Sequence, residues 1–405
     1  MRPPGGPGRR AENRGRVRIP APNLPSMTHE AESRKAAVRR LERGAPLHRS
    51  LDVTRPKAWI RLDGDVRHAV RHGALAPSHG WLTGVHGPGW RGLWDRAADR
   101  VRETPDEARL ALALCDPDGR IRQAALAHAA GRPEVLPLVA VRAADWAQPV
   151  RARALAVLRE QLPAASHESL AVTAPVILRL GRRLRGGAAA ELLDGLLRHG
   201  DVARVNTLLL GCPDGPTRRA ALSAVLDRGL YSGLGLALVA AGDHDPVVQE
   251  RAASAAVAAD EPDATVPVLL GSRSGRVRAA GVTALRGAGR HAEAEPYLYD
   301  RSGRTRACAR WVLRQGGRDP VAAYRAACTG PDVPDRAPLG LGECGTRSVD
   351  APLLRELTAH GGGRVRAAAV AGLRLLDAVE PARMRALLDD PEPAVVREAK
   401  RALYG

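Results

Sequence analysis

The residue types best suited to binding or catalysis gather between residues 59 and 94. His68 and His72 stand four residues apart, so on a helix they would share one face and could bind a metal ion. No glutamate stands beside them in the His-Glu-x-x-His arrangement of zinc enzymes, so we expect no metal site. Two other interpretations stay open: a cap whose indole rings cover the exposed end of the fold, or a partner-binding patch. The segment holds Trp59, Trp81, Trp90, Trp94, His68, His72, His79 and His86.

A second candidate is Asp145-Trp146, followed by Arg151 and Arg153. Base excision needs a carboxylate near the sugar and an aromatic ring beside the displaced purine. The group faintly resembles the HEAT-like alkylpurine DNA glycosylases, so nucleic-acid binding or DNA repair is an alternative hypothesis. Against it, Asp145 also stands at a turn, and beyond residue 100 the chain offers only Trp146 and Trp311.

Motifs of other enzyme classes are missing from the sequence. There is no Gly-x-Gly-x-x-Gly after a predicted strand, no Walker loop and no nucleophile elbow. We therefore predict no enzyme activity, no catalytic residue and no cofactor.

One string of residues recurs along the chain, so the elements that position these side chains must repeat as well. Ser274-Gly275-Arg276-Val277-Arg278-Ala279-Ala280 returns as Gly363-Arg364-Val365-Arg366-Ala367-Ala368. When its second arginine is taken as a marker, ten copies follow one another at spacings of 28 to 34 residues. The markers are Arg122, Arg151, Arg185, Arg218, Gln249, Arg278, Arg306, Arg336, Arg366 and Arg397.

Each period contains the start and stop signals of two helices. An aspartate at the turn can cap the following helix by accepting backbone N–H bonds. A proline near the helix start, such as Pro149 or Pro246, loses no hydrogen bond there. Small and apolar residues then alternate at helical spacing until Gly or Pro interrupts them. Two helices of about three turns each, with their turns, fill roughly 30 residues, so the chain is predicted to be all-α.

The strings Asp145-Trp146-Ala147-Gln148-Pro149-Val150-Arg151 and Asp390-Pro391-Glu392-Pro393-Ala394-Val395-Val396-Arg397 resemble the HEAT-repeat family, specifically the short HEAT-like repeats of the bilin-lyase type. The resemblance covers about residues 100–405. It implies a right-handed α-solenoid, an armadillo-like superhelix of about ten two-helix repeats. It also implies that each turn Asp caps its helix and meets an Arg of a neighbouring repeat. This structural ladder would contain Asp116, Arg122, Asp145, Arg151, Asp214, Arg218, Asp300 and Arg306.

The charge of the chain suits an acidic partner. The formal net charge is +18, and clustered cations also bind phosphate backbones. Nearly all of it is arginine, in a composition typical of a bacterial GC-rich genome, so codon usage accounts for part of the charge. Residues 1–26 form a basic tail that is predicted to be disordered and, since Met27 is a plausible start, is not necessarily translated. We expect degenerate repeats and the Trp-rich cap in residues 27–99 and the repeat array in residues 100–405.

Cysteine usage and hydropathy indicate a cytoplasmic protein. The five cysteines form no Cys-x-x-Cys pair and are expected to be buried thiols in a reducing compartment. No apolar run approaches the roughly 18–20 residues of a membrane span, and no signal-peptide core follows the N-terminus.

These observations predict a non-catalytic scaffold that binds a protein or an acidic peptide on a concave face, which the resemblance builds from the second helices of the repeats. The rival nucleic-acid hypothesis predicts arginines along one concave stripe and affinity that falls steeply with salt. The oligomeric state is not specified by the sequence. Candidate partner-binding residues are Arg276, Arg278, Arg304, Arg306, Arg364, Arg366, Trp81, Trp90 and Trp94.

Overall fold

The computed structural model describes residues 27–75 and 106–405, with side chains from residue 35 onward. The described residues form helices joined by turns, with no β-strand among them, and the predicted all-α solenoid is confirmed. The basic tail, the expected boundary near residue 100 and most of the tryptophan-rich segment lie outside the described residues. That segment includes Trp81, Trp90 and Trp94.

Ten helices of the array each follow the turn that carries the repeated string. They are α7 (Gly119–Ala127), α9 (Gln148–Gln161), α11 (Gly187–His199), α13 (Gly215–Asp227), α15 (Pro246–Ala258), α17 (Gly275–Gly287), α18 (Gly303–Gln315), α20 (Ala337–Cys344), α22 (Gly363–Leu375) and α24 (Pro393–Tyr404).

A second helix follows each of the first nine and returns the chain to the next turn. These elements are α8 (Leu136–Arg142), α10 (His167–Gly181), α12 (Val202–Asn206) with the π-helix η4 (Thr207–Gly211), α14 (Gly233–Gly242), α16 (Pro262–Leu270), the 3₁₀ helix η5 (His291–Tyr299), α19 (Pro320–Thr329), α21 (Arg347–Leu357) and α23 (Pro381–Ala386). Short 3₁₀ turns η2 (Pro133–Val135), η3 (Leu162–Ala164) and η6 (Leu387–Asp389) adjoin α8, α9 and α23.

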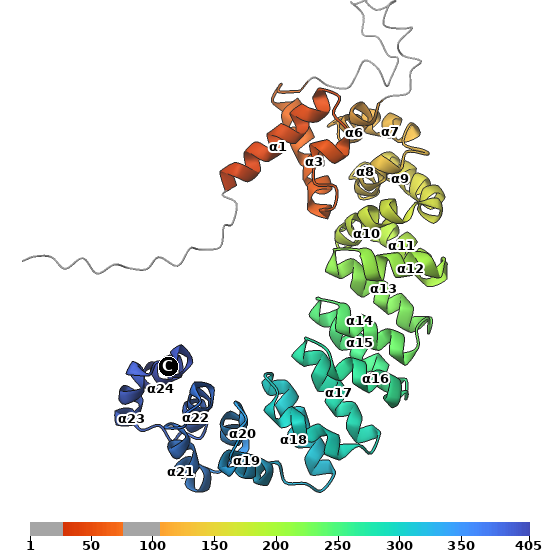
Figure 1. Ribbon diagram of the computed structural model, residues 1–405. Helices are drawn as coiled ribbons and strands as arrows, with labels where there is room; N and C mark the ends of the chain where they lie inside the picture. Colours follow the sequence, from red (N-terminus) through yellow and green to blue (C-terminus); the bar gives the residue numbers. More distant parts are fainter. Residues whose placement is uncertain (1–26, 76–105) are drawn as a thin grey trace, which may run out of the picture.

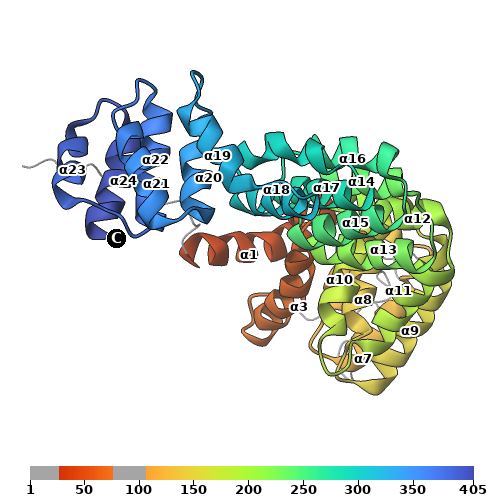
Figure 2. The same cartoon turned by 90° about the horizontal axis from the view of Figure 1, so that it is seen from below.

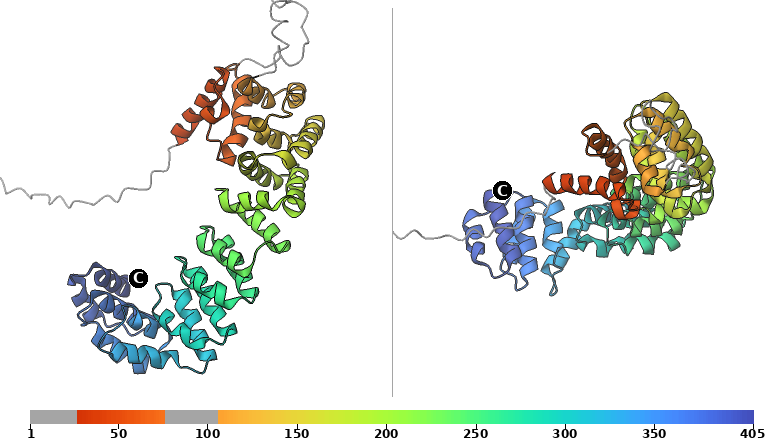
Figure 3. Two further views of the ribbon diagram at one scale, coloured as in Figure 1. Left: turned by 45° about the vertical axis from the view of Figure 1, so that its right-hand side comes forward. Right: turned by 90° about the horizontal axis from the view of Figure 1, so that it is seen from above.

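The repeats follow one another along an open curve (Figure 1). Seen from below, the units from α7 to α24 keep their chain order along it (Figure 2). The last units bend round toward the open side (Figure 3). At this end, α22 and α24 face the interior of the curve and α21 lies on its outer edge (Figure 1). The expectation that second helices line the concave face is therefore wrong for these units, because α22 and α24 are first helices.

The turn that precedes each first helix is built from polar side chains. Asp118, Asp214 and Asp245 accept backbone N–H bonds of the helices that they cap. Asp145 and Asp300, predicted as caps, stand instead two residues ahead of the N-cap, and each accepts the amide N–H two residues on. Asp116 does the same for Asp118. In most turns, therefore, the residue that caps the helix is not the aspartate predicted to belong to the ladder.

The core consists of small and aliphatic side chains, as expected of a chain without phenylalanine. One cluster of buried side chains extends from Val38 to Val277, and a second extends from Val266 to Met384. The two meet at α16 and α17, so apolar contact continues along the described array. Because each repeat contacts mainly its neighbours, the stability of the array rests on the interfaces between successive repeats.

Three further helices pack against the start of the array: α1 (Met27–Glu42), α2 (Leu47–Ser50) and α3 (Pro56–Arg71). Helix α1 contacts α6 (Glu107–Leu114), and α3 contacts α8 and α10. The string from Asp63 to Val70, which resembles a degenerate repeat, lies inside α3 and forms no turn of its own. Trp59 is buried, with its indole N–H donating to the carbonyl of Val53.

Candidate interaction surface

An arginine stands at the repeated position of six first helices, and in five of them it makes two kinds of bond. Its Nη1 donates to the backbone carbonyl six residues earlier, in the turn of its own repeat. Its Nε and Nη2 donate to the two oxygens of one carboxylate in the next repeat, and we call this second pairing a rung. Complete rungs with aspartate join Arg122 to Asp145, Arg218 to Asp243, Arg278 to Asp300 and Arg366 to Asp390, at distances of 2.7–3.1 Å.

The rungs vary where the sequence of the turn varies. Arg306 pairs with Glu343, which lies within α20 rather than in a turn. At Gln249 the rung is neutral, since Gln249 accepts a bond from the hydroxyl of Ser274 at 2.9 Å. Arg397 does not occupy the rung position of α24; counted from the N-cap Glu392, that position is Val396.

Burial and hydrogen bonding set the charge state of the rung carboxylates. Burial pushes the pKa of Asp145 upward, but hydrogen bonds from Arg122 and the amide of Ala147, with the charge of Arg142, leave that pKa below its usual value. The pKa of Asp300 is lowered in the same way, burial opposing the bond from Arg278. In Asp390 the hydrogen bond from Arg366 is the largest cause of the lowered pKa. These three carboxylates are therefore ionised and paired at neutral pH.

Three of the predicted partner-binding arginines therefore serve as ladder residues. Arg278 and Arg306 are 7% and 4% exposed, and Arg366 holds Asp390 from a mostly covered position. Their assignment to partner binding is wrong, because their guanidinium groups are already occupied inside the array.

The other three predicted arginines reach the surface. Arg276 is half-buried and pairs with Glu250 at 2.8 Å. Arg304 is exposed and has no hydrogen-bond or ionic partner among the described residues. Arg364 is 81% exposed and makes an ion pair with Asp335 at 3.2 Å.

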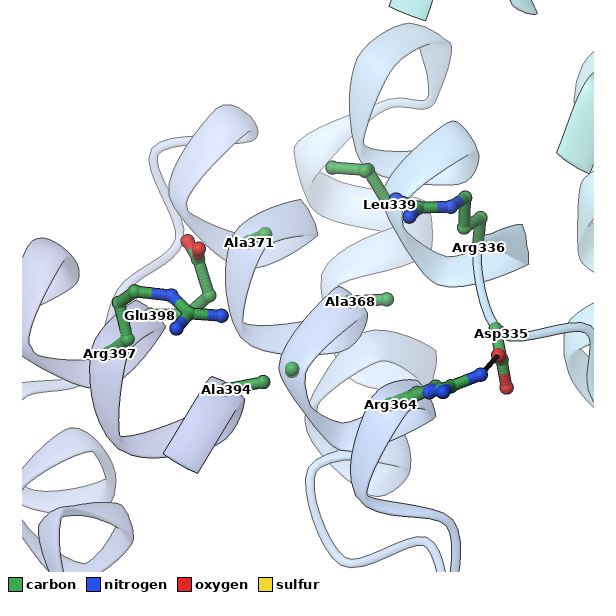
Figure 4. Close-up of a pocket in the computed structure, with 10 residues that line it drawn as sticks. Asp335, Arg336, Leu339, Arg364, Ala368, Ala371, Ala394, Arg397 and Glu398 are labelled. Carbon is green, nitrogen blue, oxygen red and sulfur yellow. Dashed lines mark hydrogen bonds and ion pairs between the residues drawn. The ribbon is translucent and has the colours of Figure 1, made fainter. Parts of the chain in front are cut away.

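Arg364 borders an open groove of about 290 Å³ over α20, α22 and α24. Its floor is formed by alanines, because the first helices carry small residues where they face outward between the units. Figure 4 shows Arg336 and Leu339 on one side of this floor and Arg397 and Glu398 on the other. The alanines are Ala367, Ala368, Ala371 and Ala394.

The two sides of the groove carry cations with no carboxylate of their own. Arg336 and Arg397 are exposed, and neither has a hydrogen-bond or ionic partner in the described part of the chain. Glu398, the one acid on the Arg397 side, pairs with Arg401 at 2.6 Å. The groove therefore combines a smooth apolar floor with uncompensated positive charge on both sides.

The chain matches no family model, and no curated protein sequence matches it. Among solved structures it is similar to the karyopherin Kap121p bound to the extreme C-terminus of the protein phosphatase Cdc14p, with 11% identity, a TM-score of 0.35, and coverage of 94% of this chain and 50% of Kap121p. For Kap121p bound to Nup53p, the identity is 13%, the TM-score 0.30 and the coverage 94% and 50%. An engineered protein aligns at 16% identity and a TM-score of 0.23, over 91% of this chain and 98% of its own.

The chain thus spans about half the length of Kap121p. At these identities and TM-scores, the likeness is one of helical architecture.

The residues of the base-excision hypothesis are not arranged for that chemistry. Asp145 is 4% exposed, and both of its carboxylate oxygens accept bonds from Arg122, with Arg142 as a further donor. It cannot reach a sugar without breaking this network. Trp146 is exposed, and the guanidinium of Arg122 lies 5.8 Å from its ring centre.

The histidines and cysteines occupy ordinary structural positions. His68 and His72 lie at the end of α3 with ring centres 4.1 Å apart. Within the described residues, no group of three His, Cys, Asp or Glu side chains is placed to hold a metal ion. Cys115, Cys212 and Cys328 are buried thiols, whereas Cys308 and Cys344 are half-buried. Burial raises the pKa of Cys115 and of Cys328 to about 12, which disfavours a reactive thiolate.

No helix in the described ranges 27–75 and 106–405 has the length and apolar character needed to cross a membrane.

Proposed function

We propose that this protein is a non-catalytic scaffold that holds an acidic segment of a protein partner in the groove over α20, α22 and α24. The observation that carries the proposal is the pair of uncompensated arginines, Arg336 and Arg397, on opposite sides of an alanine floor. Arginine presents a planar fork of donors that matches a carboxylate. Arg364 adds a third cation, because its pair with Asp335 is exposed and can open at low cost.

The floor of the groove supports a peptide rather than a small molecule. Alanine side chains let a backbone approach closely, and the groove is open along the units instead of enclosing a ligand. Small-molecule sites bury most of their ligand in a concave pocket, which this surface does not provide. An extended or helical segment with Asp or Glu residues would satisfy the arginines at both sides.

A charge-reversal experiment tests this proposal. The full chain, tagged, is incubated with native lysate with and without nuclease, and the captured proteins are identified by mass spectrometry. The double variant R336E/R397E is compared with R374E/R385E, which makes the same charge change at two exposed arginines outside the groove. Neither of these arginines has a side-chain partner among the described residues.

We expect a defined protein in both wild-type samples, retained by R374E/R385E and lost by R336E/R397E. Equal retention by both variants would exclude the groove as the binding site. Capture of nucleic acid, with the proteins lost after nuclease treatment, would instead favour the nucleic-acid alternative.

A further inference from the structure

The ladder contains one arginine that has no carboxylate partner. Arg151 in α9 makes the usual bond to its own turn, with Nη1 donating to the carbonyl of Asp145 at 2.7 Å. No bond from its Nε or Nη2 occurs within the described residues, whereas the other rung arginines use both atoms. Its guanidinium is therefore held in the rung orientation with two donors unused.

The register of the turns explains why the acceptor is missing. The rung aspartates Asp145, Asp243, Asp300 and Asp390 each stand two residues ahead of the N-cap of their helix. For α11, which packs against α9, the N-cap is Gly186, so the equivalent position is Leu184. This leucine is 94% exposed. By sequence count, a nearly fully exposed leucine therefore stands at the position that holds a covered aspartate in four other turns, and α11 supplies no carboxylate there.

Elsewhere in the described array, where either the arginine or the carboxylate of a rung is absent, the other residue is absent too or a different residue takes its place. After α11, Ala190 and Cys212 occupy the two rung positions, and neither carries a charge. Between α20 and α22 the positions hold Gly340 and His360. Gln249 accepts a hydrogen bond from Ser274, and Arg306 donates to Glu343 in place of an aspartate. Arg151 is the exception among the described residues, because the arginine is present and the carboxylate that would accept its hydrogen bonds is absent.

The surroundings of Arg151 are strongly basic and partly apolar. Residues 146–190 contain seven arginines and two glutamates. Arg182, Arg183 and Arg185 in the α10–α11 turn are exposed and have no side-chain partner among the described residues. Trp146, whose carbonyl lies 3.5 Å from Nη1 of Arg151, is also exposed.

We infer that the Arg151 rung is completed by a carboxylate of a partner protein, an Asp or Glu side chain within an acidic segment that also carries an apolar residue. The fork of Arg151 has the orientation that takes aspartate four times in this array, and exposed Trp146 beside it provides apolar contact. The inference rests on the proposed scaffold function and adds a second anchor at α9–α11, separate from the groove at α20–α24.

The test uses the full chain and fluorescence anisotropy. The probe is a fluorescein-labelled peptide of alternating Asp or Glu with Leu or Ala. A matched peptide carries Asn and Gln instead, and a labelled DNA oligonucleotide serves as a third probe. In R151Q the fork and its charge are lost. L184D introduces a carboxylate at the rung position counted from the N-cap, where we expect it to compete for Arg151, and L238D is its control because Leu238 is another exposed leucine on a different unit.

We expect R151Q and L184D to weaken binding of the acidic peptide about tenfold or more, as loss of a charge-assisted pair implies, and L238D to leave it nearly unchanged. L184D should also raise the thermal midpoint relative to L238D, because it restores an internal rung. Circular dichroism checks that each variant is folded.

Several results would overturn the inference. One is equal peptide binding by wild type, R151Q and L184D; another is binding of the Asn/Gln peptide as tight as that of the acidic one; a third is Arg151-dependent binding of DNA in preference to peptide. The proposed groove is tested in parallel with R336Q/R397Q. Binding lost in that variant but kept in R151Q would reject the Arg151 site and leave the scaffold proposal standing, whereas binding insensitive to both would reject both.

Discussion

Asp145 is the residue on which most of the buried charge at the start of the array converges. It accepts bonds from Arg122 and Arg142, and Arg67 of α3 approaches it to 3.6 Å. Arg142 in turn pairs with Asp63. Removal of the central carboxylate would leave the buried guanidinium of Arg122 without a counter-charge. Such breaking of a buried pair typically costs about 3–5 kcal/mol, whereas loss of an exposed pair costs about 0–1 kcal/mol.

We therefore expect D145N to lower the free energy of unfolding by about 3–5 kcal/mol, measured by urea denaturation with a helix signal. The matched control is D263N, which removes a carboxylate that is almost fully exposed and pairs with Arg290 at 3.2 Å. If the two variants unfold at the same urea concentration, the charge cluster around Asp145 does not stabilise the array.

For individual residues, the sequence predicts which residue types form the ladder better than it predicts which aspartate pairs with which arginine. A recurring Asp and Arg are visible in the printed string, but the register of a rung depends on how two repeats pack. Glu343 could not be predicted as the partner of Arg306, because it comes from inside a helix 37 residues later. Arg397 was misaligned for a simpler reason: Val395 and Val396 shift the arginine by one residue relative to the other copies.

At the scale of elements, helices α20 and α22 approach each other unusually closely because glycines meet at their contact. A Cβ atom on Gly342 would overlap the backbone of Gly372. Substitution with alanine must push the two helices apart, and overpacking of this kind typically costs about 1–3 kcal/mol. We expect G342A to lower the thermal midpoint and to widen the groove over α20, α22 and α24.

The control for G342A is G64A in α3, where a Cβ atom meets nothing within 4 Å. Alanine there should stabilise the helix, since glycine in a helix interior is less favourable by about 1 kcal/mol. Thermal unfolding followed by circular dichroism compares the two variants. A G342A protein as stable as G64A would show that the α20–α22 contact relaxes without strain.

The elements themselves were largely predictable, and the groove was not. A 30-residue period with Asp, Pro and Gly at the turns determines where helices begin and end, whichever partner the protein binds. The alanines of the groove floor, by contrast, have the same sequence signature as core alanines. Ala368 and Ala369 are neighbours in one helix, yet the first faces the groove and the second faces the core. Only the packing of α22 on its neighbours separates them.

At the scale of the whole molecule, the ladder is uneven, and its weakest part is the unit formed by α11, α12 and η4. No Arg–Asp rung joins this unit to either neighbour in the described array: Arg151 has no acceptor on one side, and Ala190 and Cys212 occupy the two rung positions on the other. Successive rungs instead join the units from α13 to α20. In a solenoid, stability is approximately the sum of the repeats and their nearest-neighbour interfaces, so local opening should begin where an interface is weakest.

We expect backbone amides of residues 187–211 to exchange with deuterium at least about tenfold faster than those of α15 and α17, a difference of about 1.4 kcal/mol in opening free energy. Hydrogen-exchange mass spectrometry measures both regions in one sample. The variant L184D should slow exchange in α11 by restoring a rung to Arg151, while L238D should not. Equal protection of α11–η4 and α15–α17 in the wild-type protein would mean that apolar contact, and not the ladder, sets the strength of the interfaces. A partner protein that completes the Arg151 rung should slow exchange in α11, as L184D should. The same measurement therefore tests whether binding of that partner stabilises the interface between α9 and α11.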